Sequence, residues 1–181
     1  MRVRDQDNCI IWFNGPSRNA LLDLPHHFTE IGCNYILQDR RVDHVVAYDA
    51  RVVNTVPATE GVQRWSTRFG GFTDWPRGWR EVRMPTYRRP EQSGTLAVAL
   101  ADQLRFRRLW ILGCDWGINT KTIYDYGCGR SARKHTNSQK RLMEHWAQRL
   151  DIHVVADRTR DVSVPHITQV QFRKWYQDQL G

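Results

Sequence analysis

The 181-residue sequence contains no run of eighteen apolar residues, and its opening MRVRDQDN lacks the apolar centre of a signal peptide. A membrane-spanning helix needs about 20 apolar residues in succession, and a secretory signal needs such a centre. We therefore expect a cytoplasmic protein without a membrane span. Internal repeats and low-complexity tracts are also absent, so this length predicts one domain over residues 1–181.

Cysteine is scarce, and its spacing fits neither a metal site nor a disulfide framework. The four cysteines stand at positions 9, 33, 114 and 128, and no two of them form a CxxC pair. Zinc and disulfide frameworks in proteins use closer, paired spacings. We expect reduced thiols and no metal ligands among them.

Lysine is scarce as well, because arginine supplies 23 of the 27 basic residues in a chain of net charge +8. The planar guanidinium group of arginine binds phosphate better than an ammonium group does. Eight tryptophans add surfaces on which bases can stack. The composition favours an anionic partner, with nucleic acid among the candidates, although genomic base content also produces arginine-rich chains.

Apolar segments that end in polar residues alternate with helical patterns along the chain, which is typical of an α/β fold. Continuous apolar strands such as CIIWF are buried on both faces of a parallel sheet, so we predict a doubly wound, mostly parallel sheet. The Gly-, Pro-, Trp- and Arg-rich region 54–90 predicts loops and short strands that form a lid or an acceptor surface. Strands are predicted at 9–14, 32–37, 44–48, 109–112 and 152–157, and helices at 18–24, 92–106, 138–150 and 168–179.

Polar residues follow several of these strands, and the carboxyl ends of parallel strands meet at one edge of a sheet. In the NGPS turn, Gly15 lets the backbone approach a ligand, and Ser17 caps a helix whose first amides face a phosphate. Ser93 and Gly94 form the same combination of a capping serine and a glycine at the start of the next long helix. Such turns also occur for folding reasons alone. The residues expected to converge are Asn14, Gly15, Ser17, Asp49, Ser93, Gly94, Asp115 and Trp116.

The segments NGPS, GCN and SGTLAVALADQLRFRRLWILGCDWG resemble, in this order, the bacterial sialyltransferases of glycosyltransferase family 42. The resemblance covers about residues 9–157 and is sharpest in the last segment. A weaker resemblance links the same order to the 6-hydroxymethylpterin diphosphokinase-like family. The first resemblance implies a Rossmann-like variant of the GT-A fold and a domain that binds a nucleotide sugar of cytidine or uridine type.

Carried over residue by residue, the resemblance implies that one group of residues lines the donor. This group comprises Asn14, Gly15, Ser17, Asn34, Asp49, Ser93, Gly94, Gly113, Asp115 and Trp116. The sequence departs from the family pattern at Asp49, which replaces an asparagine, and at Gln92, directly before Ser93, which replaces a threonine. The family arginine before the SG pair is displaced onto Arg88 or Arg89, so the donor sugar is not fixed by the resemblance.

The resemblance also implies the catalytic residues. Tyr124 and Tyr126 fall where the family has two tyrosines that hydrogen-bond the leaving phosphate, which suits an enzyme without a metal ion. His135 lies three residues ahead of Ser138 and matches the family's general base, which removes a proton from the acceptor hydroxyl.

Three functions remain open from the sequence. The first is a glycosyltransferase whose acceptor is a glycan or, given the charge, a hydroxymethylated pyrimidine in DNA. The second is an ATP-dependent diphosphokinase in which Asp49 and Asp115 hold magnesium. The third is a non-catalytic protein that binds nucleotides or nucleic acid. The oligomeric state is not fixed by any motif.

Overall fold

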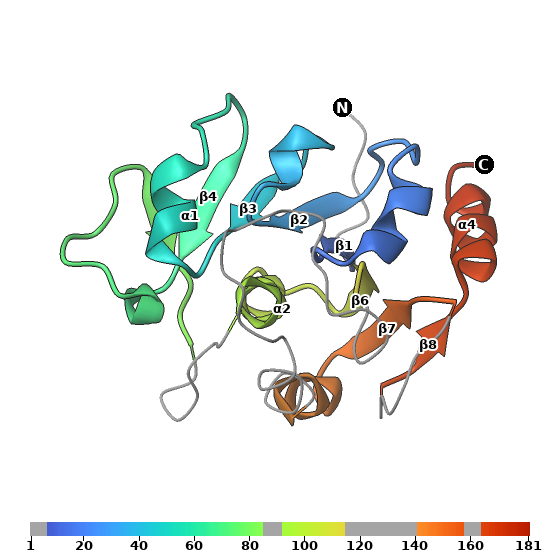
Figure 1. The fold of residues 1–181 in the computed structure, drawn as a ribbon. Coiled ribbons are helices and arrows are strands. Elements are labelled where there is room, and N and C mark those ends of the chain that lie inside the picture. The colour runs from blue at the N-terminus through green and yellow to red at the C-terminus, as the bar shows by residue number, and fades with distance from the viewer. Residues whose placement is uncertain (1–6, 85–91, 115–140, 158–163) are drawn as a thin grey trace.

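In the described part of the chain, the sheet has eight parallel strands. The structure is a computed structural model, and it describes residues 7–84, 92–114, 141–157 and 164–181. The strands are β1 (Asn8–Trp12), β2 (Thr29–Cys33), β3 (His44–Val46), β4 (Gln63–Ser66), β5 (Trp79–Glu81), β6 (Arg108–Leu112), β7 (Asp151–Val155) and β8 (His166–Ile167). Their order is β5-β4-β3-β2-β1-β6-β7-β8, and every neighbouring pair is parallel. Figure 1 shows this sheet, and the predicted doubly wound α/β fold is confirmed.

The chain winds outward from β1 in two directions. It first steps through β2, β3, β4 and β5 and then returns to the other side of β1 with β6, β7 and β8. The strand order therefore reverses between β1 and β6. In open α/β sheets, ligands bind outside the carboxyl ends of the strands at this kind of switch point.

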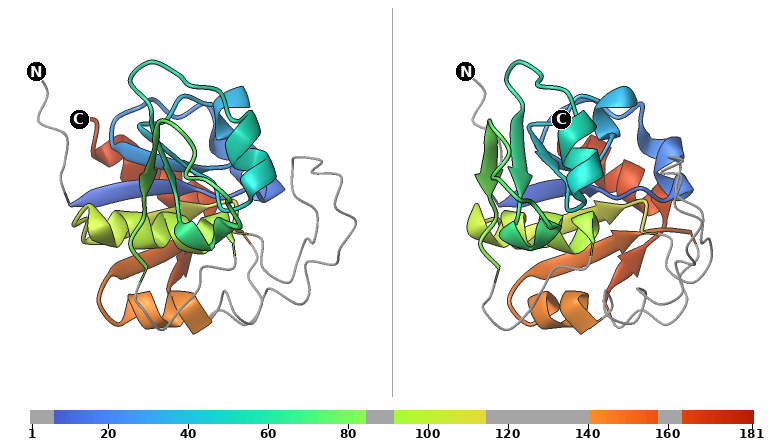
Figure 2. Two further views of the ribbon diagram at one scale, coloured as in Figure 1. Left: turned by 90° about the vertical axis from the view of Figure 1, so that its left-hand side faces the viewer. Right: turned by 60° about the vertical axis from the view of Figure 1, so that its left-hand side comes forward.

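Two hydrophobic layers cover the two faces of the sheet, because successive side chains of a strand point to opposite sides. Cys9 and Ile11 of β1 face one layer, which contains α2 (Ser93–Gln103) and the helical residues 141–147. Ile10 and Trp12 face the other layer, with α1 (Ala50–Thr55), η1 (Pro16–Leu21), η2 (Ile36–Gln38) and α4 (Gln169–Asp178). Figure 2 shows these layers from two further sides.

The element boundaries differ from the predicted ones where a turn is set by tertiary contacts. The strand predicted at 32–37 runs from Thr29 to Cys33, because Asn34 turns the backbone with φ 55°. The helix predicted at 18–24 is instead the 3₁₀ helix η1, which begins at Pro16. Region 54–90 contributes β4 and β5 to the sheet and also the end of α1, a six-residue helix that its β-branched composition did not predict.

Both predicted serine caps are wrong. The N-cap of η1 is Gly15, and no side chain bonds the first amides there, so Ser17 has no capping role. The N-cap of α2 is Gln92, and Ser93 is the first residue inside the helix. A residue inside the helix has helical backbone angles, so its hydroxyl group can serve a tertiary contact in place of the cap.

A buried ion pair braces the second layer. Glu30 is fully buried, and its carboxylate accepts hydrogen bonds from Arg40 at 2.5 and 2.6 Å and from the indole of Trp12 at 2.8 Å. The Arg40 guanidinium also donates to the carbonyl groups of Leu22 and Leu24 at 3.0 and 2.6 Å. Because every polar group of the pair has a partner, the two charges are tolerated in the core.

Candidate functional site

The switch point is closed by the turns that follow β1 and β6. Phe13 N–H donates to Leu112 O and Gly15 N–H donates to Gly113 O, both at 2.8 Å. Gly113 has φ +73°, and a Cβ atom there would lie 2.8 Å from Phe13 O and 2.9 Å from Gly15 O. Only glycine fits, so Gly113 lets the turn after β1 lie directly against the end of β6.

The NGPS turn offers a phosphate fewer donors than the sequence predicts. Gly15 has an ordinary extended backbone with φ −75° and ψ 146°, and its N–H already bonds Gly113. Pro16, the first residue of η1, has no N–H to offer. The Gly15 N–H therefore joins the turn after β1 to the end of β6. Its backbone angles are open to other residues as well, so they do not indicate that a ligand approaches closely at Gly15.

Arg18 is a buried charge beneath this turn that sequence reasoning missed. Its side chain is fully buried, and Nη1 donates to Phe13 O at 2.8 Å while Nη2 contacts the Asp39 carboxylate at 2.7 Å. The guanidinium ties the end of β1 to the segment after η2. Arginine is common in this chain, so nothing in the local sequence distinguished this one.

Asn34, Ser93 and Tyr48 join three segments at the same edge of the sheet. The Ser93 hydroxyl donates to Asn34 Oδ1 at 2.6 Å and accepts from Tyr48 N–H at 3.0 Å. Asn34 and Ser93 are buried, and Asn34 follows β2 while Tyr48 follows β3. The structure thus brings together two residues, Asn34 and Ser93, that the sequence assigned to one site from 59 positions apart.

The N-terminus of α2 lies against the end of β1. A Cβ atom on Gly94 would lie 2.7 Å from the Phe13 ring, so the glycine permits this close contact. The first N–H groups of an α-helix have no acceptor within the helix and carry the positive end of its dipole. Since η1 is short and irregular, α2 provides the stronger site for an anion at this edge.

Asp49 and Asn14 differ in how their side chains are used. Asp49 is exposed and accepts a hydrogen bond from Arg51 N–H at 2.8 Å as the N-cap of α1. Asn14 Oδ1 is buried beside the switch point and has no hydrogen-bond partner in the described part of the chain. A buried acceptor without a donor is costly, so the Asn14 side chain is suited to accept a hydrogen bond from a ligand.

The remaining predicted site residues lie outside the described residues. They are Asp115, Trp116, Tyr124, Tyr126 and His135. Ser17 lies in η1, and its carbonyl oxygen accepts a hydrogen bond at 2.8 Å from the Gln169 side chain at the start of α4.

The cysteines have structural roles where the structure describes them. Cys9, Cys33 and Cys114 are buried, and none of these three forms a disulfide in the described residues. Burial raises the pKa of Cys33 to about 12, although the charge of Arg18 acts in the opposite direction. A thiol with so high a pKa is not a nucleophile near neutral pH. Among the described residues, no three His, Cys, Asp or Glu side chains gather as metal ligands.

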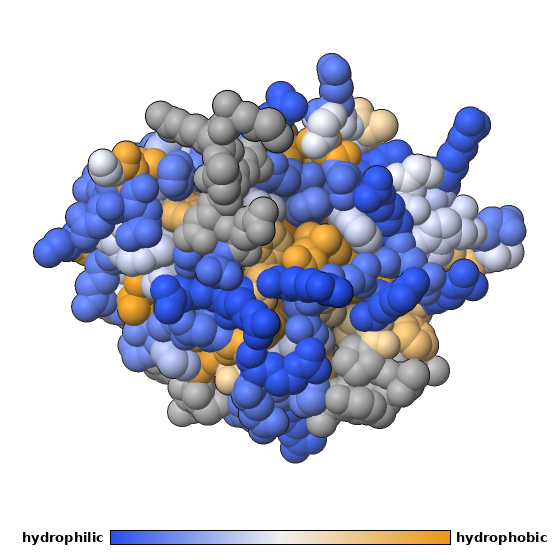
Figure 3. Space-filling model, turned by 180° about the vertical axis from the view of Figure 1, so that it is seen from behind, coloured by the Kyte–Doolittle hydropathy of each residue, from blue (hydrophilic) through white to orange (hydrophobic). Residues whose placement is uncertain are grey.

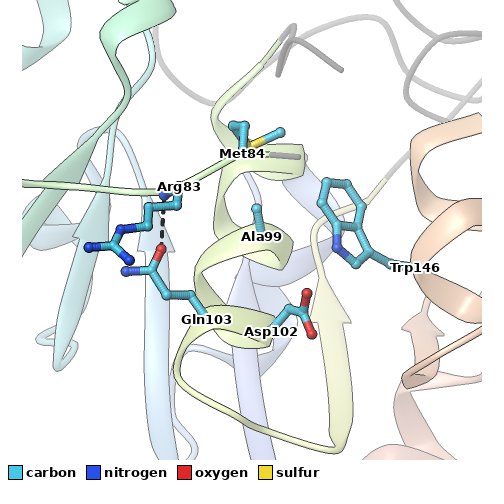
Figure 4. Close-up of a pocket in the computed structure, with 6 residues that line it drawn as sticks. All are labelled: Arg83, Met84, Ala99, Asp102, Gln103 and Trp146. Carbon is cyan, nitrogen blue, oxygen red and sulfur yellow. Dashed lines mark hydrogen bonds between the residues drawn. The ribbon is translucent and has the colours of Figure 1, made fainter. Parts of the chain in front are cut away.

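A pocket of about 230 Å³ lies elsewhere, beside the C-terminal half of α2 (Figure 4). Its lining includes Arg83, Met84 and Trp146, together with Asp102, whose carboxylate accepts two hydrogen bonds from Arg149 at 2.8 and 2.9 Å. The side chain of Gln103 accepts the Arg83 N–H at 2.9 Å. No predicted site residue lines this pocket, so it is distinct from the edge described above.

A scan against protein-family models finds no match, and no curated protein matches the chain in sequence. A comparison of structures finds the sialyltransferase CST-II, solved in complex with a trisaccharide acceptor and CMP. The two chains share 13% sequence identity and superpose with a TM-score of 0.45. The aligned region covers 81% of this chain and 80% of the CST-II chain. In the described residues, no helix combines the length and apolar character that crossing a membrane requires.

Proposed function

We propose that this protein is a glycosyltransferase that moves a sugar from a nucleotide-sugar donor of cytidine or uridine type to an acceptor hydroxyl. The observation that carries the proposal is the convergence at one sheet edge of residues from four segments. Asn34 bonds Ser93, Gly15 bonds Gly113, and Gly94 packs on Phe13, the residue before Asn14. This edge is the switch point of the sheet, where α/β proteins bind nucleotides.

In this proposal the donor phosphate lies at the N-terminus of α2. The first amides of the helix, from Ser93 and Gly94, face the negative charge, and Asn14 supplies the polar side chain whose Oδ1 still needs a hydrogen-bond donor. Donor hydroxyl or amino groups have the chemistry to satisfy that oxygen. Asp115, Trp116 and Asp49 are assigned to the nucleotide and sugar by the sequence resemblance.

The chemical step is assigned from the sequence alone. His135 takes the proton of the acceptor hydroxyl, the oxygen attacks the anomeric carbon, and the bond from this carbon to the donor phosphate breaks. Tyr124 and Tyr126 donate hydrogen bonds to the departing phosphate, so that no metal ion is needed to stabilise its charge.

A thermal-shift screen with nucleotides and nucleotide sugars, each with and without magnesium, tests the donor. A ligand of the native state raises the melting temperature by mass action, by an amount that grows with its concentration above Kd. We expect stabilisation by a cytidine or uridine sugar in the absence of metal. Stabilisation only by ATP with magnesium would overturn the proposal in favour of the diphosphokinase.

The catalytic assignment is tested by His135→Ala once a turnover assay exists. We expect His135→Ala to lose turnover while its melting temperature and donor affinity stay unchanged. The matched control is His166→Ala, at an exposed position of β8, which we expect to keep its turnover. If His135→Ala turns over normally, the base assignment is wrong. Assays with a neutral glycan and with DNA containing hydroxymethylated pyrimidine separate the two acceptors.

A further inference from the structure

The outer end of the sheet, at β4 and β5, carries two reciprocal pairs of arginine and tryptophan. Arg64 stands opposite Trp79 across the two strands, and Trp65 stands opposite Arg80. The Arg64 guanidinium lies 5.4 Å from the Trp79 ring centre, and that of Arg80 lies 5.5 Å from the Trp65 ring centre. Because Trp65 and Trp79 belong to the two opposite layers, each face of this end presents one stacked guanidinium.

Among the described residues, no carboxylate forms an ion pair with either of these guanidinium groups. Arg64 donates to Val56 O at 3.3 Å, and its guanidinium is so close to Gly78 that a Cβ atom there would lie 2.7 Å from Nη2. Arg80 donates to the Gln63 side chain at 3.1 Å. Neutral acceptors fix both groups and leave their positive charge uncompensated.

Two further arginines enlarge the uncompensated charge. In the described part of the chain, neither Arg77 nor Arg83 forms an ion pair with a carboxylate, and both are exposed. Only Arg68 pairs in this segment, with Glu81 at 3.1 Å. Elsewhere some exposed arginines do form ion pairs, such as Arg149 with Asp102. We call the exposed groups of residues 63–84 the β4–β5 surface.

The same segment also carries exposed aromatic rings. Phe69 is 43% exposed and Trp75 is 38% exposed, which makes them two of the few large apolar side chains that the described residues leave open to solvent. The Trp75 indole N–H donates to Trp79 O at 2.9 Å, and its ring meets Phe72 edge to face at 5.8 Å. The exposed face of Trp75 is therefore held fixed at the edge of the sheet.

The left view of Figure 2 faces this end of the molecule. On the right of Figure 3, where the same end lies, strongly hydrophilic side chains project beside residues of intermediate hydropathy. β5 is the outermost strand and has only three residues, so little edge is left for another strand to pair with. The side chains, rather than the backbone of the edge, form the available surface.

We propose that the β4–β5 surface binds single-stranded nucleic acid. The unpaired guanidinium groups of Arg77, Arg80 and Arg83 contact phosphates, and the fixed face of Trp75 stacks an unpaired base. A single strand fits better than a duplex, because only unstacked bases can reach an aromatic ring at a surface. The inference concerns binding alone and does not depend on the proposed transferase.

Fluorescence anisotropy of a labelled 20-nucleotide single strand, at several salt concentrations, tests the surface. We expect the triple variant R77Q/R80Q/R83Q to weaken binding at least tenfold and to reduce the slope of log K against log salt by about 2, since each phosphate contact contributes about 0.7. Trp75→Ala weakens binding roughly tenfold, and Trp75→Phe retains most of it.

The matched control is R107Q/R141Q/K174Q, which removes the same charge from exposed positions outside the β4–β5 surface. We expect a change of less than about threefold for this control at moderate salt, where long-range charge effects are screened. Equal loss in both triple variants, no binding by the parent protein, or tighter binding of an acidic polysaccharide with no effect of Trp75→Ala would overturn the proposal. The donor screen has its own readout, so either proposal can fail alone.

Discussion

At the scale of single residues, the Ser93 hydroxyl links the ends of two strands to the start of α2. Its partners Asn34 Oδ1 and Tyr48 N–H lie at 2.6 and 3.0 Å, and Ser93 itself is buried. A buried group that loses its partner bears its full desolvation cost, whereas a made bond contributes less. This residue therefore affects stability as well as the geometry of the site.

We predict that Ser93→Ala lowers the free energy of unfolding by about 1–3 kcal/mol, because it removes two buried hydrogen bonds, to Asn34 Oδ1 and from Tyr48 N–H. Urea denaturation measures the change. Ser66→Ala is the matched control, since its buried hydroxyl donates a hydrogen bond of 2.7 Å to Ala47 O, which is not one of the predicted site residues. We expect Ser93→Ala alone to weaken stabilisation by the nucleotide sugar, and equal weakening by both variants would contradict the site.

The buried thiol of Cys33 makes stability depend on alkaline pH. Its folded pKa is about 12 against an ordinary value of 9.0, so above pH 9 the unfolded chain releases a proton that the folded chain keeps. Stability from this group is complete below pH 9 and falls between pH 9 and 12 by about 1.4 kcal/mol per pH unit.

Denaturation of the parent protein and of Cys33→Ala at several pH values isolates this contribution. We expect the variant to lose stability less steeply above pH 9, although its cavity makes it less stable than the parent below pH 9. Parallel pH profiles for the two proteins would show that the thiol does not titrate differently on unfolding.

At the scale of elements, Gly113 decides how β1 and β6 end. Both Gly113 and Gly71 have a left-handed backbone, with φ +73° and +77°, but a Cβ atom on Gly71 would meet nothing within 4 Å. The two glycines therefore share a conformational cost and differ in packing.

We predict that Gly71→Ala destabilises by about 1 kcal/mol, from the left-handed conformation alone. Gly113→Ala costs at least about 2 kcal/mol more, because the added carbon displaces the turn after β1. Urea midpoints of the two variants measure the difference. Equal losses would mean that the β1 and β6 turns are not in the close contact described.

At the scale of the whole molecule, one sheet joins all the described elements, and its two layers of side chains are both continuous. The prediction of one domain therefore has a direct thermodynamic test. Tryptophans lie throughout the chain, among them Trp12 and Trp146 in opposite layers, so their fluorescence follows the packing of both.

We predict a single unfolding transition in urea, with the same midpoint by tryptophan fluorescence and far-ultraviolet circular dichroism. A chain of two independent units would give two midpoints or non-coincident curves. In the proposed picture, a nucleotide sugar shifts both curves together, because its site lies at the centre of the sheet.

The sequence determined the local pattern of this protein, because the information for that pattern lies in neighbouring residues. Continuous apolar strands such as Asn8–Trp12 required burial on both faces, and the segment Ser93–Gln103 had to be a buried helix. These features predicted the doubly wound sheet and the edge at which the site is proposed.

Only the tertiary structure decided what the individual residues at that edge do. Gly15 donates a hydrogen bond to Gly113, Ser93 bonds Asn34 in place of capping its helix, and Arg18 is buried beneath the turn. The arginine and tryptophan pairs of β4 and β5 likewise exist only once those strands align. Each of these roles depends on contacts between residues distant in sequence, and no local pattern records such contacts.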